Sequence, residues 1–203
     1  MHTVAIERGM QALVLADPDI ARTYPLVGAP SPRQRDPGFA TFFSTIVSQQ
    51  ISTQAARAIM GRVKLLIPEI STSAVLEVDG QALRDAGLSW RKVEYVKGLA
   101  DAVHTKVFDA EELDILNDDE VIAAITQLRG FGRWSAEIYL IFSLKRTDIF
   151  PADDLALRVA LGRLKGMDDK PTPQQARQLV EHWAPWRSVG SLFLWHYYHG
   201  EPL

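Results

Sequence analysis

Two adjacent aspartates, Asp153 and Asp154, stand at the predicted start of a helix in the sequence FPADDLALR (150–158). Aspartate is a common helix N-cap, because its carboxylate accepts hydrogen bonds from the unpaired N–H groups of the first turn. The same N–H groups and the helix dipole favour the charged form of a carboxylate. An ionised carboxylate could also stabilise positive charge that develops in a transition state, or orient an attacking water. The pair alone favours a cap, and chemistry needs further support.

A glycine-containing hairpin is predicted one helix before this pair. In AAITQLRGFGRWSAEIYLIFSL (123–144), an apolar helix ends at Gly130 and a second helix starts at Gly132. Glycine permits a positive φ or a close approach of backbones, and the free N–H groups that start the second helix can bind a phosphate. Arg129 and Arg133 flank the turn and add positive charge. An ordinary αα-hairpin with a glycine C-cap explains the same spacing, so both interpretations stay open.

Helical spacing dominates the elements that must hold these residues, and strand signals are weak. Capping boxes are predicted at Asn117 with Glu120 and at Thr172 with Gln175. Residues 28–38 (GAPSPRQRDPG) are rich in proline and glycine and are the best linker candidate. The sequence therefore predicts an all-α fold. Helices are expected at residues 4–16, at 39–68 as two helices broken near 48–52, and at 90–107, 120–128 and 186–198.

The overall composition excludes several kinds of chemistry. The chain of 203 residues has no cysteine, which excludes disulfides, thiolate metal sites and cysteine nucleophiles. Its net charge of −3 gives no global sign of nucleic-acid binding, so such binding must depend on a local patch. No apolar run approaches the roughly 18 residues that span a bilayer, and the amino terminus has no signal-peptide pattern. We therefore expect a cytoplasmic protein, associated with the nucleoid if it binds DNA, that contacts no membrane.

Five sequence blocks, in order, resemble the HhH-GPD superfamily of DNA base-excision glycosylases, and within it the AlkA-type DNA-3-methyladenine glycosylases. The resemblance covers most of the chain from about residue 39 to the end, and a lone GFG would carry much less weight. The chain has little room before residue 39 for the extra amino-terminal domain of longer AlkA-type proteins, so it resembles the short form. The blocks are IVSQQIS (46–52), LRDAGLSWRKVEYVKGLA (83–100), LRGFGRWSA (128–136), FPADDLALR (150–158) and WAPWRSVGSLFLW (183–195).

The resemblance implies two helical lobes with an active-site cleft between them. We expect one lobe at about residues 35–145 and the other at 1–34 plus 146–203 of a single glycosylase domain. The implied activity is removal of alkylated bases, 3-methyladenine foremost, from duplex DNA by a monomeric enzyme that flips the damaged nucleotide into a pocket. The alternatives are a glycosylase for another lesion, such as an oxidised purine or uracil, and a non-catalytic binder of DNA structure.

The resemblance also assigns roles to individual residues near the aspartates. Alignment without gaps from Trp134 puts the catalytic position on Asp154 and leaves Asp153 as N-cap or orienting neighbour, whereas alignment on the residues downstream favours Asp153. Trp134 stands where bifunctional relatives carry a Schiff-base lysine, so a monofunctional, water-using reaction that leaves an abasic site is expected. Trp134 and Trp195 would line the base pocket. The family's tyrosine position is occupied by Ile138, with Tyr139 beside it.

Contacts with DNA are implied at the hairpin and at the loop in IVSQQIS. Gln50 falls where a residue would wedge into the gap left by the flipped base, and Gln49 could bond the orphaned partner base, although polar residues at a helix end explain both glutamines nearly as well. Relatives often bind a monovalent cation, Na⁺ or K⁺, through hairpin carbonyls, and no other cofactor is expected. The implied DNA contacts are Gly130, Gly132, Arg129, Arg133, Ser135, Gln49 and Gln50, and the implied cation ligands are the main-chain carbonyls of Thr126, Leu128 and Phe131.

Overall fold

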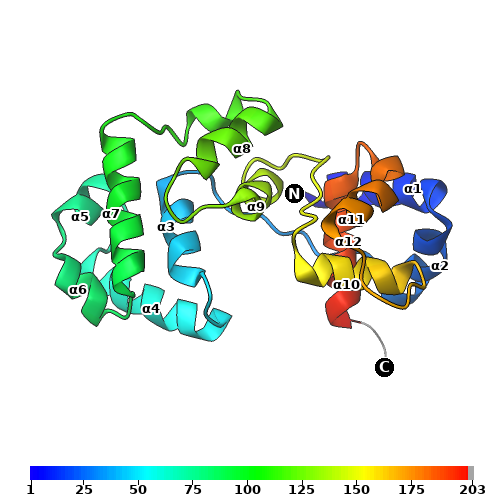
Figure 1. Ribbon diagram of the computed structural model, residues 1–203, viewed down its shortest axis with the longest axis horizontal. Helices are drawn as coiled ribbons and strands as arrows, with labels where there is room; N and C mark the ends of the chain where they lie inside the picture. The colour runs from blue at the N-terminus through cyan, green and yellow to red at the C-terminus, as the bar shows by residue number, and fades with distance from the viewer. Residues whose placement is uncertain (201–203) are drawn as a thin grey trace. The chain divides into compact units, whose positions relative to one another are not determined.

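The regular secondary structure of the described residues is entirely helical. The computed structural model describes residues 1–200, and within that range it contains helices and no β-strand, which confirms the all-α prediction (Figure 1). No helix in this range is long and apolar enough to cross a membrane. The α-helices are α1 (Thr3–Ala16), α2 (Pro18–Val27), α3 (Phe39–Ser48), α4 (Thr53–Leu66), α5 (Thr72–Glu77), α6 (Gly80–Asp85), α7 (Trp90–His104), α8 (Asp118–Thr126), α9 (Arg133–Phe142), α10 (Leu155–Leu164), α11 (Pro173–Leu179) and α12 (Arg187–Gly200), with 3₁₀ helices η1 (Glu112–Asp114) and η2 (Glu181–Trp183).

The chain forms two compact units. The first consists of Met1–Arg35 and the chain from Trp134 onward, and the second of Asp36–Arg133. The chain therefore returns from the second unit to the first at Trp134, whereas the sequence prediction places this return near residue 145. The difference is that α9 belongs to the first unit, where Phe142 stacks on Trp195 and its carbonyl accepts the N–H of Arg35.

Capping residues set the bounds of many helices, as the sequence indicates. Both predicted capping boxes are present, at Asn117 with Glu120 and at Thr172 with Gln175. In each box the cap side chain accepts the N–H of the third helical residue, whose own side chain accepts the N–H of the cap. Since these bonds satisfy helix-end donors locally, they are visible in the sequence before any packing is known.

A buried carboxylate joins distant segments of the first unit. Asp17 is fully buried and caps α2, and its Oδ2 also accepts hydrogen bonds from Lys165 Nζ at 2.6 Å and Trp183 Nε1 at 2.6 Å, with His182 Nε2 at 2.9 Å. Burial alone would raise the pKa of Asp17, but the bonds from Lys165, Trp183 and His182 outweigh it and lower that pKa to about 2. We call Asp17, Lys165, His182 and Trp183 the Asp17 cluster. It ties the amino-terminal helices to the segments that carry α10 and α12.

Aromatic rings organise the core of the second unit. Phe42 of α3 meets Phe108 and Phe131 edge to face, with centroids 5.3 and 5.5 Å away. Such edge-to-face pairs add a preferred geometry to the burial of apolar area. The contact with Phe131 holds the turn after α8 against α3, and thereby positions the glycines of the predicted hairpin.

Candidate active-site pocket

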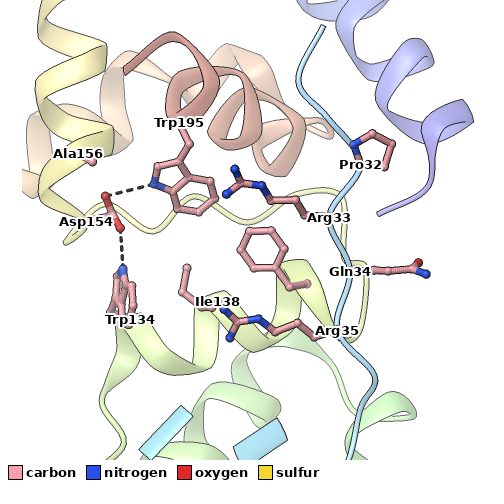
Figure 2. Close-up of a pocket in the computed structure, with 10 residues that line it drawn as sticks. Pro32, Arg33, Gln34, Arg35, Trp134, Ile138, Asp154, Ala156 and Trp195 are labelled. Atoms are coloured by element: carbon pink, nitrogen blue, oxygen red, sulfur yellow. Dashed lines mark hydrogen bonds between the residues drawn. The ribbon is translucent and has the colours of Figure 1, made fainter. Parts of the chain in front are cut away.

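A pocket of about 700 Å³ lies in the first unit, and a carboxylate, three aromatic rings and two guanidinium groups line it (Figure 2). Its volume falls within the roughly 300–1,000 Å³ typical of ligand sites. The walls come from the segment before α3, from α9, from the start of α10 and from α12. The lining residues are Pro32, Arg33, Gln34, Arg35, Trp134, Ile138, Phe142, Asp154, Ala156 and Trp195.

Asp154 is both the N-cap of α10 and the carboxylate of this pocket. Its Oδ1 accepts the N–H of Leu157 at 3.0 Å, the bond typical of an N-cap. Its Oδ2 accepts the indole N–H of Trp134 at 2.9 Å, and Oδ1 lies 3.4 Å from the indole nitrogen of Trp195 (Figure 2). Three N–H donors therefore surround one half-buried carboxylate and fix its orientation. Capping and chemistry are not alternatives at this position, since one side chain can serve both.

Asp153 takes a different place. Its side chain is 48% exposed and lies 3.6 Å from Arg177 Nη2 of α11, and it does not line the pocket. The expectation that Asp153 caps the helix is therefore wrong, because Leu155 is the first helical residue and the cap is the residue just before it. A turn in which Asp154 N–H donates to the carbonyl of Pro151 brings the chain into α10 at that register.

The two predicted tryptophans line the pocket, but their roles are wider than stacking. Trp134, at the start of α9, is 42% exposed, and Trp195 of α12 stacks on Phe142 with centroids 5.7 Å apart and an interplanar angle of 29°. Each also directs its indole N–H toward Asp154. The tryptophans therefore orient the carboxylate as well as offering π surface to a ligand.

The neighbouring positions on α9 differ in the direction they face. Ile138 lines the pocket, as predicted, whereas Tyr139 is only 4% exposed and lies outside the residues that line it. Tyr139, the other position predicted for the pocket, does not line this one, because successive residues of a helix point about 100° apart. Ser135, predicted to contact DNA, is half-buried next to Trp134.

One wall of the pocket was not predicted from the sequence. Pro32–Arg35 belongs to the predicted linker, yet it runs along the pocket and is joined to α9 by the hydrogen bond from Arg35 N–H to the carbonyl of Phe142 at 2.9 Å. Phe142 and Ala156 were missed as well. The segment has no helical period and many prolines, so the one signal available was its pair of arginines two residues apart.

The predicted hairpin turn lies in the second unit and depends on one of its glycines. Gly130 has φ +92°, and a Cβ there would lie 2.4 Å from Cδ2 of Tyr95, so both the dihedral and the space require glycine. Gly132 has no positive φ, and a Cβ there would meet nothing within 4 Å. Neither the backbone conformation nor the packing of this chain therefore requires glycine at Gly132. The space around Gly132 is open to an incoming group.

The flanking arginines of the turn are both exposed, but they differ in what they contact. Arg129 forms an ion pair with Glu94 of α7, so part of its charge is already offset. Arg133 begins α9. Arg133 therefore lies closest to the helix start at which a phosphate is expected.

The two glutamines lie in the loop between α3 and α4. Gln49 is half-buried, and its Nε2 donates to the carbonyl of Gly130 at 2.7 Å, which joins this loop to the hairpin turn. Gln50 is exposed and has φ +57°, a conformation uncommon for residues other than glycine. The loop thus presents Gln50 to solvent while Gln49 anchors it.

The hairpin carbonyls are compatible with a cation site. Thr126 ends α8, and Phe131 N–H donates to the carbonyl of Leu128 at 3.1 Å, so a tight turn brings these backbone positions together. Main-chain oxygens suit hard cations, and a carbonyl that accepts one hydrogen bond keeps a second lone pair. Among the residues within 1–200, no cluster of three histidine, aspartate or glutamate side chains could hold a metal ion.

Comparison with known proteins agrees with this architecture. A DNA-3-methyladenine glycosylase 1 from Schizosaccharomyces pombe is 34% identical over 154 residues, which are 74% of this chain and 68% of that protein. Two solved structures are 30% identical. They are a DNA-3-methyladenine glycosidase from Bacillus halodurans (TM-score 0.85, 94% of this chain and 88% of that chain) and an S. pombe 3-methyladenine DNA glycosylase in complex with abasic DNA (TM-score 0.82, 93% and 95%).

The family assignment itself rests on a match over most of the chain. Residues 43–185 match the HhH-GPD superfamily of base excision DNA repair proteins. This range includes the glutamine loop, the hairpin turn, Trp134 and Asp154. The chain therefore belongs to the HhH-GPD superfamily.

Proposed function

We propose that this protein is a monofunctional DNA glycosylase that removes alkylated bases, 3-methyladenine foremost, from duplex DNA. The observation that carries the proposal is the carboxylate of Asp154, held by Trp134 and Trp195 in the wall of a pocket of nucleotide size. The names of the similar proteins, which are DNA-3-methyladenine glycosylases, support the substrate class.

Positive charge develops on the sugar during the proposed reaction, and the Asp154 carboxylate can stabilise it. As the C1′–N bond breaks, the base leaves with the bonding electrons and the sugar becomes positively charged, so an ionised carboxylate near C1′ lowers the barrier. A water then adds to C1′ and loses a proton, which Asp154 or solvent accepts, and an abasic sugar remains. An alkylated purine already carries positive charge and leaves as a neutral base, so no acid is needed to protonate it.

The aromatic walls suit an electron-poor base. Trp134, Trp195 and Phe142 offer π surface on which an extruded base can stack. A cationic alkylated base is attracted to such faces by cation–π interaction, which is strongest for tryptophan. The normal bases lack this charge and hold their glycosidic bonds more firmly, which favours excision of the damaged one.

We further propose that the enzyme has no lyase activity. A Schiff base requires an amine that can lose its proton, and no lysine is among the residues that line the pocket. Arg33 and Arg35 do line it, but a guanidinium stays protonated and is no nucleophile. Strand cleavage through a covalent amine intermediate is therefore not expected.

The DNA would be held chiefly at the hairpin turn and the glutamine loop. We propose that the first N–H groups of α9, with Arg133, bind a backbone phosphate, and that Gln50 enters the space left by the extruded nucleotide. A monovalent cation would be held by the carbonyls of Thr126, Leu128 and Phe131, where it would add positive charge facing a phosphate. The protein is proposed to act as a monomer.

The proposal is tested by incubating the protein with duplex DNA that carries N-methylated purines and measuring the free base by chromatography. Wild-type protein and Asp153→Asn should release the base, whereas Asp154→Asn should lose at least a hundredfold in rate. Because asparagine is also a good N-cap, loss of activity in Asp154→Asn should not come with loss of folding. Full release by Asp154→Asn together with no release by Asp153→Asn would overturn the assignment.

The same reactions distinguish the remaining alternatives. Strands should stay intact until alkali or heat is applied, and cleavage without either would contradict the monofunctional mechanism. A chain that binds DNA with a steep salt dependence but releases no base from any lesion duplex would be a structure binder and not an enzyme.

A further inference from the structure

The wall formed by Pro32–Arg35 is fixed in place from two sides. Arg35 N–H donates to the carbonyl of Phe142, and the amino-terminal ammonium of Met1 donates to the carbonyl of Arg33 at 2.6 Å. Both partners belong to the same unit as the segment itself. These main-chain bonds set the register of the segment, so the directions of its side chains are determined and not arbitrary.

Alternation along the segment sends both arginines to the pocket side. In Figure 2 the guanidinium groups of Arg33 and Arg35 point into the pocket, that of Arg33 toward Trp195 and that of Arg35 toward Ile138. The side chain of Gln34, between them, points away. This is the period of two expected of an extended chain, in which residues i and i+2 lie on one side.

Within residues 1–200, neither guanidinium has an anionic partner. Among the described residues, the side chains of Arg33 and Arg35 make no hydrogen bond and no ion pair; the contact of Arg35 is with the ring of Phe142, whose centroid lies 5.8 Å from its Cζ. Burial lowers the pKa of Arg35. Two exposed guanidinium groups therefore line a pocket together with one carboxylate, Asp154, whose oxygens are already occupied by three N–H donors.

The charge of the substrate decides what these groups bind. A cationic alkylated base is repelled by an uncompensated guanidinium in a partly desolvated site, and so is the positive charge that develops on the sugar. A phosphate has the opposite effect, because it offers two oxygens in the geometry that a guanidinium matches and cancels the positive charge. Phosphate oxygens and sugars together receive about half to two-thirds of all protein–DNA hydrogen bonds.

We propose that Arg33 and Arg35 form a clamp for the backbone phosphate of the extruded nucleotide. The inference rests on the proposed function in so far as the pocket receives a nucleotide from DNA. On binding, the phosphate neutralises the guanidinium pair, so that Asp154 faces the sugar without opposing positive charge. The two arginines are positioning residues: they place the sugar against Asp154 and do not touch the reacting bond.

The test uses duplex DNA that carries a tetrahydrofuran abasic analogue, which has phosphates but no base to read. Dissociation constants are measured over a series of salt concentrations for wild-type protein, Arg33→Gln and Arg35→Gln. Each substitution should weaken binding about tenfold and reduce the salt slope by about 1, the value for one lost phosphate contact. Arg8→Gln, which removes an exposed arginine of α1, should change neither quantity.

The particular phosphate is identified by replacing those next to the analogue, one at a time, with neutral methylphosphonates. Wild-type protein should lose affinity when the phosphate at one or two positions is replaced. Arg33→Gln should bind the replaced and the unreplaced DNA equally well at those positions, since the substitution and the methylphosphonate remove the same contact. Additive losses at every position would overturn the proposal. An unchanged salt slope with an altered preference among lesions would also overturn it, because the arginines would then be reading the base.

Two controls keep the result decisive. Arg35 packs on Phe142, so its replacement can disturb folding; thermal melting identifies that outcome, and Arg33→Gln then carries the test alone. Release of methylated base by the wild type is assayed in parallel. Phosphate coupling without base release would refute the proposed function and leave the clamp standing, whereas base release without coupling would refute the clamp.

Discussion

The hairpin turn and the pocket carry the two halves of the proposed function, and they are built in opposite ways. The turn is continuous in sequence, and its shape follows from one positive-φ glycine, one buried ring and one bond from a nearby loop. The pocket gathers residues from four separate segments, and no two of its polar groups come from one local motif apart from the arginine pair. A local motif can be read from the chain, whereas an assembled site depends on everything that holds its segments together.

The largest expected effect is on the stability of the first unit, the unit that contains the pocket. Asp17→Asn leaves Lys165 without its buried carboxylate, and breaking such a pair typically costs about 3–5 kcal/mol. The free energy of unfolding, from urea denaturation followed by tryptophan fluorescence, should fall by that amount. Asp19→Asn, which removes a half-exposed partner of the same lysine, should cost less than about 1 kcal/mol. Equal losses in the two variants would show that the cluster does not hold the first unit together.

The next prediction concerns the stability of the hairpin turn. Gly130→Ala forces a non-glycine residue to φ +92° and pushes a Cβ into Tyr95, so it should cost about 2–3 kcal/mol. Gly132→Ala meets open space and should change stability by less than about 1 kcal/mol. Both are measured by denaturation. If Gly132→Ala keeps its stability but binds DNA more weakly, the space at Gly132 serves the ligand, and equal stability losses would contradict the geometry.

A pH titration of stability sharpens the account of the Asp17 cluster. The pKa of Asp17 is about 2 in the folded protein against an ordinary value of 3.8, so the folded state binds its proton more weakly than the unfolded state. Its contribution, about 2 kcal/mol, is present above pH 4 and is lost as pH falls from about 4 to about 2. Asp148, whose pKa is lowered by its hydrogen bonds with Arg187, acts in the same direction. A flat stability profile between pH 4 and 2 would contradict this picture.

The smallest expected effect comes from variants of Trp134 and Trp195, which test whether these residues act by orienting the Asp154 carboxylate or by stacking on the base. Trp134→Phe keeps an aromatic ring but removes the N–H bond to Asp154, and base release should slow about tenfold, or 1.4 kcal/mol in the barrier. Trp195→Phe removes a longer bond, at 3.4 Å, and should slow release less. Single-turnover rates on N-methylated DNA give both values. A larger effect at Trp195 would mean that stacking, and not the orientation of Asp154, sets the rate.

The predictions from sequence succeeded where the physics is local. The capping boxes at Asn117 and Thr172, the ends of the helices and the positive φ of Gly130 depend on neighbours within a few residues. The close approach of Tyr95 to Gly130 is not local, since the two residues are 35 positions apart. They failed at steps of a single residue. Asp153 was expected to cap α10 or to orient its neighbour, and the adjacent Asp154 is the cap. Ile138 and Tyr139 were both expected at the pocket, and Ile138 is among its lining residues while Tyr139 is not.

Other features lay beyond any local pattern. The linker candidate at 28–38 contains the wall that carries Arg33 and Arg35, because a segment without helical period can still be held by a main-chain bond to α9 and another to Met1. The burial of Asp17 among Lys165, His182 and Trp183 joins residues more than 140 positions apart. Nothing near Asp17 in sequence distinguishes it from an ordinary exposed N-cap.

By itself, the sequence determined an all-α chain with a glycine turn and a pair of aspartates at a helix start, since each of these follows from residue type and short spacing. Its resemblance to the glycosylases added that Trp134 stands where bifunctional relatives carry a lysine. Only the tertiary structure decided that Asp154 accepts both indole N–H groups, that Asp153 turns to Arg177, and that two arginines from the linker face the same pocket. The reason is physical: hydrogen bonds between distant side chains form only after burial has brought their segments together.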